Sequence, residues 1–308
     1  MPHDSFGGRS YEFSTSSNRR SVVELDIHAI CLALNEAVFI DKQLETLYPF
    51  CSGISILSQY DRDWYGNPVE PDDTIQKVLS HPDPDGKIHL IMRRWRDQAA
   101  ALNSEVKALS SEPHKDIQSH GTPMEEIQRF HSTPDYFLIV DADEFYDVDT
   151  FENIIGYLAK RRPRGMRVTG YQYLYTWNER IPVDEFRFHQ FGFLRPGVTF
   201  EFARRVSWNE SRLSKLLGLL RLPDFSSRLF GFIDCPMDVG VFHHGAYLGG
   251  EERLEEKFSK HVHQGEDVNE NLREKAYARD LDYEYVPTGE LPRNIREAEW
   301  PSEFIDRE

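Results

Sequence analysis

The sequence has few cysteines, little positive charge relative to its acids, and no long apolar run. Its three cysteines, Cys31, Cys51 and Cys235, lie far apart and form no C-x-x-C pair, which argues against a disulfide framework and a thiolate metal site. We therefore expect a reduced, cytoplasmic protein. A formal net charge of -16 leaves no basic footprint for a nucleic-acid polymer. No apolar stretch approaches the roughly 18 residues of a membrane span, so we expect no transmembrane segment.

Residues 1–20 are rich in serine, glycine and arginine and lack the hydrophobic segment of a signal peptide. We expect this segment to be disordered, with order beginning near Val22. Of the 308 residues, 39% are hydrophobic and 13% are aromatic. That composition is enough to bury a full core in one large α/β domain or two small ones.

The first half of the chain alternates apolar segments with amphipathic ones. This alternation predicts a mostly parallel, right-handed α/β sheet with helices on both faces. We expect strands over residues 27–34, 54–57, 87–92 and 136–140, and helices over residues 38–47, 74–79 and 97–109. Asn35 stands just before the first of these helices, where it can act as the N-cap.

After Thr150 the pattern becomes more aromatic and less regular. We expect a helix over 151–160, an aromatic strand over 167–177, short β segments over 186–202, a last strand over 239–247, and further helices over 211–222, 251–263 and 271–280. The C-terminal segment is rich in proline and charge, and we expect it to be weakly constrained.

One stretch joins a buried strand to three acids: Asp135-Tyr-Phe-Leu-Ile-Val-Asp141-Ala-Asp143-Glu144. Strand alternation directs Asp141 and Asp143 to the same side. Like charges this close need water or a cation to screen them, and ligands usually bind at the carboxyl edge of an open α/β sheet. Mg2+ and Mn2+ prefer oxygen ligands and bridge carboxylates to phosphate. We interpret Asp141 and Asp143 as ligands of such a cation beside a phosphorylated substrate; the alternative is an acidic, solvated turn.

Two adjacent histidines, His243 and His244, end the last expected strand. A neutral imidazole is a common third ligand for a metal that carboxylates already hold. Because neighbours on a strand point to opposite faces, we expect one of the two at most to reach the cation. The alternative for either residue is a structural histidine with its hydrogen bonds satisfied.

A further group of polar residues follows the first two strands. Asn35 and Glu36 come directly after the first strand, and Asp61 follows the second. We interpret them as contacts for a nucleobase or ribose at the same edge of the sheet. The alternative is structural, with Asn35 capping a helix and Glu36 complementing its macrodipole.

Together these motifs resemble a glycosyltransferase of the GT-A fold, close to family 2. Residues 30–40, with Asn35 and Glu36, are similar to the first strand and helix of those enzymes, which hold the nucleotide base. Asp141-Ala-Asp143 resembles their Asp-x-Asp, which binds the ribose and a Mn2+ or Mg2+ on the donor pyrophosphate.

Two further segments take part in this resemblance. His243 or His244 resembles the C-terminal metal-binding histidine of many GT-A enzymes, and the stretch around Asp97 resembles the helix that faces the donor. The resemblance implies a GT-A catalytic domain over 21–265, with a nucleotide-sugar-binding half (21–150) and an acceptor-binding half (151–265), and a helical extension over 266–308. It implies a hexosyl or related transferase whose donor is a nucleoside-diphosphate sugar, with UDP favoured. The acceptor stays open between a glycan, a peptide, a metabolite and a nucleoside.

Two features depart from the family pattern. The usual Asp-Gly-Ser-x-Asp after the second strand is replaced by Gln59-Tyr-Asp61-Arg-Asp63, which leaves the identity of the base open. No clear x-Glu-Asp supplies the catalytic base of an inverting reaction, and a retaining reaction would need none. Asp234 is our candidate base; the alternatives are Asp224, Glu201 and Glu210.

Three other classes of protein share part of the pattern. A haloacid-dehalogenase-type phosphatase also places an Asp-x-Asp after an apolar strand, but it normally carries Thr or Val where this chain has Phe145. A sugar nucleotidyltransferase normally has a Gly-rich loop after its first strand, and residues 34–37 contain no glycine. A non-catalytic sugar-nucleotide-binding protein stays open, and donor binding without turnover would reveal it.

Overall fold

The first half of the chain folds as the alternating pattern predicts. A computed structural model describes residues 25–110, 133–183, 188–202, 205–208, 231–249 and 283–305. Its first parallel strands are β1 (Ile27–Leu32), β2 (Gly53–Ser58), β3 (Ile88–Met92) and β4 (Tyr136–Asp141). The helices between them are α1 (Ile40–Leu47), α2 (Thr74–Ser80) and α3 (Gln98–Ser110). The predicted α/β class with a mostly parallel sheet is confirmed.

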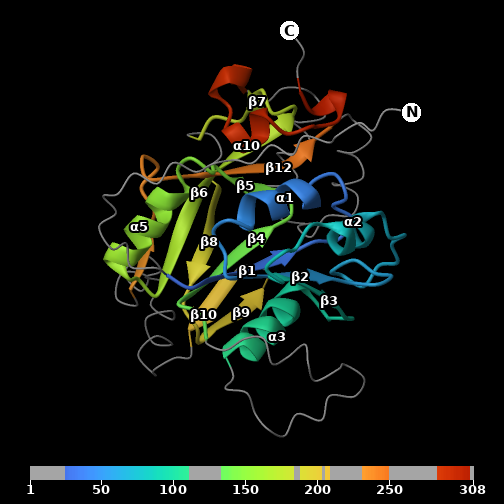
Figure 1. The fold of residues 1–308 in the computed structure, drawn as a ribbon, viewed down its shortest axis with the longest axis vertical. Coiled ribbons are helices and arrows are strands. Elements are labelled where there is room, and N and C mark those ends of the chain that lie inside the picture. Colours follow the sequence, from blue (N-terminus) through green and yellow to red (C-terminus); the bar gives the residue numbers. More distant parts are fainter. Residues whose placement is uncertain are drawn as a thin grey trace, which may run out of the picture.

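The strand order brings the carboxyl ends of β1 and β4 together. These strands lie in the order β3-β2-β1-β4, so the chain moves along the sheet in one direction and then returns to the other side of β1. As a result α1 and α2 cover one face of the sheet and α3 covers the other, as predicted (Figure 1). Open α/β sheets bind ligands beside such a reversal of strand order. Here the two strand ends are Leu32 and Asp141, which are paired in register.

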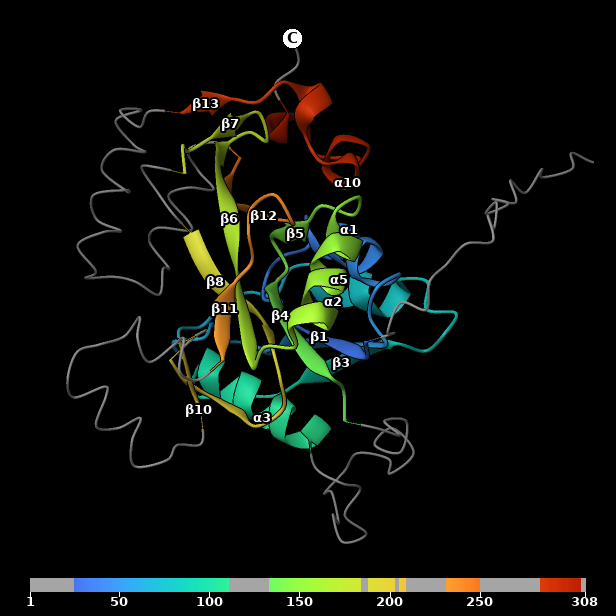
Figure 2. The same cartoon turned by 90° about the vertical axis from the view of Figure 1, so that its left-hand side faces the viewer.

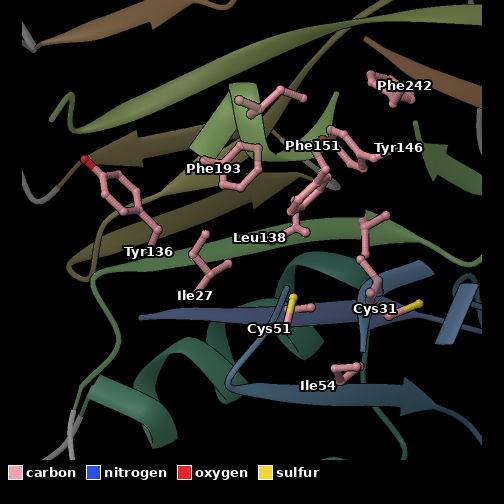
Figure 3. Packing of buried hydrophobic residues seen from close by; sticks show 14 of the residues in the cluster. Ile27, Cys31, Cys51, Ile54, Tyr136, Leu138, Tyr146, Phe151, Phe193 and Phe242 are labelled. Carbon is pink, nitrogen blue, oxygen red and sulfur yellow. The ribbon is translucent and has the colours of Figure 1, made fainter. Parts of the chain in front are cut away.

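Two buried cores hold these helices on the sheet. The first packs β1, β2 and β4 against α1 and against α5 (Phe151–Arg161). Figure 3 shows its aromatic part, where Tyr146, Phe151 and Phe193 lie together. The second core packs the opposite face of the same strands against α3. Burial on both faces explains why the sequence of β4 is apolar until its last residue.

The second half of the chain extends the sheet beyond β4. β8 (Phe188–Leu194) lies antiparallel between β4 and β6 (Gly165–Tyr175). β12 (Phe242–Leu248) is parallel to β6 and antiparallel to β5 (Glu144–Tyr146), the short strand after the acidic motif. The expected aromatic strand and the strand expected over 239–247 are thus confirmed as β6 and β12, although β12 is not the last strand of the chain, because β13 (Glu284–Tyr285) follows it. The remaining strands of this half are β7 (Glu179–Arg180), β9 (Val198–Phe202), β10 (Arg205–Trp208) and β11 (Phe232–Asp234).

The C-terminal segment packs against the rest of the protein, so the expectation that it is weakly constrained is wrong. β13 (Glu284–Tyr285) pairs with β7, and Figure 2 shows both strands at one end of the protein with α10 (Arg293–Arg296). Two short 3-10 helices, η1 (Thr288–Glu290) and η2 (Ser302–Phe304), flank α10. The apolar side chains of this segment pack with aromatic and aliphatic residues from earlier in the chain and form a third core: Phe39, Phe145, Tyr173, Trp177, Leu248, Val286, Leu291, Ile295, Trp300 and Phe304. Widely spaced apolar residues in a charged segment give no periodic signal.

Several expectations concern residues outside the described part of the chain. These are the disordered segment at 1–20, the helices at 211–222, 251–263 and 271–280, and the alternative bases Glu210 and Asp224. The domain boundaries stay a prediction. No helix among the described residues combines the length and the apolar content needed to cross a membrane.

Candidate functional site

The acidic motif forms a tight, mostly buried turn between β4 and β5. Asp141 is the last residue of β4, and Glu144 is the first residue of β5. Asp143 and Glu144 are 4% and 1% exposed, whereas Asp141 is half-buried. Two of the three side chains are therefore enclosed by protein, which does not match the alternative of an acidic, solvated turn.

Hydrogen bonds from separate elements hold this turn in place. Gln43 of α1 is buried, and its Nε2 donates to the carbonyl oxygens of Asp141 at 3.0 Å and of Glu144 at 2.7 Å. The Glu144 carboxylate accepts the backbone N–H of Asp141 at 3.0 Å, and the Gly245 N–H of β12 donates to the Asp143 carbonyl at 2.8 Å. The protein itself thus fixes the backbone of the motif. Sequence reasoning missed Gln43, although a glutamine within the apolar face of a helix is a signal for such a contact.

Of the two adjacent histidines, His244 faces the acidic turn. Its Nε2 lies 3.5 Å from Oδ1 of Asp143. The register between β12 and β5 causes this, because it places His244 opposite Glu144. The two histidine side chains therefore point to opposite faces of β12, as expected from strand alternation. Of the two, only His244 remains a candidate metal ligand.

Gln172 of β6 determines which nitrogen of His244 points toward Asp143. The Gln172 amide nitrogen donates to the carbonyl oxygens of Tyr173 at 3.2 Å and of His244 at 3.3 Å, so Oε1 is the atom that lies 2.7 Å from His244 Nδ1. That oxygen can only accept, and therefore Nδ1 donates. Nε2 then faces Asp143, an orientation typical of a metal-binding histidine whose other nitrogen donates to an oxygen. The sequence does contain a signal for this role. Gln172 lies between Tyr171 and Tyr173, so it points to the opposite face of the strand from the tyrosines, as a polar residue that needs a hydrogen-bond partner.

His243 points to the other face, into an aromatic environment. Its Nδ1 lies 2.8 Å from the hydroxyl of Tyr173, and its ring centroid is 5.6 Å from that of Tyr171. Burial, together with the charge of Arg180, lowers the pKa of His243 to about 3. The geometry is that of a neutral structural histidine, which is the alternative interpretation given for one of the pair.

Carboxylates surround the imidazole of His244. Burial favours the neutral ring, but the negative charges of Asp143, Glu144 and Asp141 outweigh it and raise the pKa of His244. Among the described residues, no three His, Cys, Asp or Glu side chains converge into a complete metal-binding cluster. Asp143 and His244 offer two ligands. Two protein ligands fit the kind of Mg2+ or Mn2+ site that water and substrate phosphates complete.

Asn35 connects the end of β1 to the loop before α2. Its φ is 56°, a left-handed conformation that asparagine adopts more readily than most residues. Its Nδ2 donates to the Glu70 carbonyl at 2.8 Å, and its Oδ1 accepts the Asp72 N–H at 3.2 Å. The prediction that Asn35 caps the first helix is wrong, because α1 begins at Ile40 and its N-cap is Phe39.

Glu36 belongs to the same junction. Its backbone N–H donates to Oγ1 of Thr74 at 2.7 Å, which ties the start of α2 to the end of β1. The predicted nucleoside contacts Asn35 and Glu36 therefore lie on one connected edge of the sheet, formed by the loops after β1 and β2.

Asp61 and Asp97 lie at the ends of the next two strands and are both bound by arginines. Arg94 makes two contacts with the Asp61 carboxylate, the shorter at 2.6 Å. Asp97 caps α3, since its Oδ1 accepts the Ala100 N–H at 2.8 Å. Burial raises the pKa of Asp97, but the hydrogen bonds from Ala100 and Arg96 outweigh it, and the pKa is lowered. Both carboxylates follow strands that border the candidate site, and each contacts an arginine.

The structure does not bring Asp234, our candidate base, to the acidic turn. Asp234 is paired in register with Arg167 of β6, whose guanidinium contacts its carboxylate at 2.7 and 3.1 Å. His244 is paired with Gln172, five positions further along β6, which corresponds to about 16 Å at the usual rise of a strand. The alternative base Glu201 is exposed on β9.

Comparisons with known proteins find only partial likeness in solved structures. No family model and no curated protein matches the chain. The 1–349 fragment of S. aureus TarS in complex with UDP-GlcNAc is 14% identical, with a TM-score of 0.29 over 50% of this chain and 36% of that chain. Glucosyl-3-phosphoglycerate synthase from Mycobacterium tuberculosis, in complex with Mn2+ and UDP-glucose, is 14% identical, with a TM-score of 0.31 over 48% of this chain and 44% of that chain. The match spans less than half of either solved chain, and at these scores it carries no weight for function.

Proposed function

We propose that this protein is a divalent-cation-dependent glycosyltransferase that uses a nucleoside-diphosphate sugar as donor. The observation that carries the proposal is the pair formed by Asp143 and His244, which lies just beyond the carboxyl end of β4 and beside the reversal of strand order. Ligands of open α/β sheets bind at this position. A carboxylate and an imidazole, with further acids around them, are suited to a cation that also binds phosphate oxygens.

In this proposal Asp143 and His244 hold Mn2+ or Mg2+, and Asp141 contacts the cation or the ribose. The cation would stabilise the negative charge of the leaving nucleoside diphosphate. Gln172 orients the imidazole and Gln43 fixes the backbone of the turn, so both ligands keep their positions. The acceptor group would form a bond to the anomeric carbon in place of the bond to the diphosphate, so that the nucleoside diphosphate leaves and the acceptor's proton is released to solvent.

The remaining predicted contacts are assigned to the nucleoside end of the donor. They are Asn35, Glu36, Asp61 and Asp97, which line the loops after β1, β2 and β3. UDP is the nucleotide we favour. Arg94 already binds the Asp61 carboxylate. The contacts of this protein with the nucleobase would therefore differ from those of the Asp-Gly-Ser-x-Asp segment in the family pattern.

A thermal-shift panel tests the proposal. UDP, GDP, TDP, CDP and ADP are each added with and without Mn2+ to wild type, to Asp143→Asn and to the control Asp149→Asn, which removes an exposed carboxylate outside the turn. A ligand that binds only the native state raises the melting temperature. We expect one nucleotide with Mn2+ to stabilise wild type and the control but not Asp143→Asn. No nucleotide-dependent shift in wild type would contradict the proposal.

A further inference from the structure

The turn between β2 and α2 is held rigidly at the edge of the candidate site. The Asp63 carboxylate accepts three hydrogen bonds of 2.8 Å, from the N–H groups of Tyr65 and Asn67 and from the Asn67 side-chain amide. The Asp63 N–H donates to the Asn67 carbonyl at 2.8 Å. Gly66 has a φ of 89°, a conformation that glycine adopts without strain. These contacts fix the backbone from which the Tyr65 side chain projects.

A stacked tryptophan pair places this turn beside the start of α3. Trp64 is buried in the core under α3, and its ring centroid lies 6.3 Å from that of Trp95 at an interplanar angle of 30°. Gln59 links the same segments, because its Oε1 accepts the Trp95 N–H at 3.2 Å and its Nε2 donates to the backbone of the turn at 3.0 Å. Tyr65 follows Trp64, and Asp97 lies two residues after Trp95, so the stack places the turn that carries Tyr65 beside the segment that carries Asp97.

Tyr65 is 41% exposed on this turn, which follows the carboxyl end of β2 at the same edge of the sheet as the acidic motif. Burial raises the pKa of Tyr65, and the negative charges of Asp63, Asp141 and Asp97 raise it further. The phenol is therefore a neutral hydrogen-bond donor at physiological pH. An anionic ligand placed beside Asp141 and Asp97 needs donors. A lysine or arginine at this place would pair with those acids, whereas an uncharged phenol forms no ion pair with them.

We propose that Tyr65 is a ligand-contacting residue whose hydroxyl donates a hydrogen bond to a phosphate oxygen of the bound nucleotide. The inference rests on the proposed function and adds to it a residue that sets the affinity for the donor. The rigid turn pre-orients the donor group, which reduces the entropy lost on binding.

Tyr60 offers a matched control for the test. It belongs to the same loop, it is 55% exposed, and its hydroxyl donates to the Met92 carbonyl at 3.0 Å. The dissociation constant of UDP in the presence of Mn2+ is measured by isothermal titration calorimetry for wild type, Tyr65→Phe and Tyr60→Phe. Because a hydrogen bond to a charged group is worth roughly a tenfold to hundredfold change in affinity, we expect Tyr65→Phe to weaken binding by that factor. Tyr60→Phe should stay within about twofold of wild type.

The outcomes separate the two proposals. Equal affinities of wild type and Tyr65→Phe overturn the assignment of Tyr65 and leave the proposed function intact. An equal loss in both variants also overturns it, because the effect then belongs to the loop. A wild type that binds no UDP overturns the proposed function with UDP and the assignment together. Both substitutions keep the aromatic ring, and an unchanged melting temperature without ligand confirms that the fold is intact.

Discussion

The packing of Trp300 gives a quantitative test of how firmly the C-terminal segment is held. Trp300 is 9% exposed, and its ring centroid lies 5.8 Å from Phe39, 5.5 Å from Phe145 and 5.4 Å from Trp177. Its Nε1 donates to the Ile295 carbonyl at 2.7 Å. A buried aromatic side chain covers about 150 to 250 Å2, which corresponds to about 4 to 6 kcal/mol at about 25 cal/mol per Å2. Measured truncations of core tryptophans to alanine cost about 3 to 5 kcal/mol. We therefore expect Trp300→Ala to lower the free energy of unfolding by about 3 to 5 kcal/mol.

The assay is urea denaturation followed by circular dichroism, with the midpoint and the m value compared between variants. The control is Tyr283→Ala in the same segment. Tyr283 is 52% exposed, so its loss should change the free energy of unfolding by about 0.5 kcal/mol or less. Phe145 follows the acidic turn directly, so loss of the Trp300 ring should also weaken nucleotide binding. A cost of Trp300→Ala that is no larger than that of the control would refute the reasoning, because it would mean that the segment is weakly constrained.

Burial lowers the pKa of His28 to about 3, whereas an unfolded histidine titrates near 6.5. The unfolded state thus takes up a proton first, so the stability contributed by neutral His28 is complete above pH 6.5 and decreases between pH 6.5 and 3, by up to about 1.4 kcal/mol per pH unit. His28→Gln should flatten that part of the pH dependence of the urea midpoint, and an unchanged slope would contradict the assignment. Gly156→Ala in α5 meets nothing within 4 Å and should stabilise the protein by about 0.5 to 1 kcal/mol. Gly240→Ala would place its Cβ 2.4 Å from the side chain of Ile154 and should lower the melting temperature. Loss of a general base lowers the reaction rate by about 100- to 10,000-fold. We expect Asp234→Asn to lower the rate of sugar transfer by less than about tenfold, and a larger loss of rate would support Asp234 as the base.

The first half of the fold could be predicted because the spacing of apolar and polar residues along the sequence indicates its strands and helices. The strand from Tyr136 to Val140 is continuously apolar because both of its faces are covered, and the acids begin where the strand ends. A sequence can therefore place Asp141 and Asp143 at the carboxyl edge of the sheet. It cannot show that Gln43 holds the backbone of Asp141 and Glu144, because these contacts join residues 98 and 101 positions apart.

The choice between His243 and His244 shows the same limit. Alternation along a strand separates the two side chains, but it does not say which face meets the acidic turn. That choice depends on the register of β12 against β5, a pairing between distant segments. Asn35 was misjudged for a related reason, since its side chain bridges to the backbone of Glu70 and Asp72 instead of capping the helix that follows it.

Binding of Mn2+ followed by electron paramagnetic resonance tests the role of Asp143 and His244 most directly. The six-line signal of free Mn2+ weakens when the ion binds, so bound Mn2+ can be counted with and without UDP. We predict that UDP promotes the binding of Mn2+ to wild type and to the control Asp149→Asn, and that Asp143→Asn and His244→Gln lose this binding. Equal Mn2+ binding by all four proteins, or binding to wild type that UDP does not change, would contradict the account.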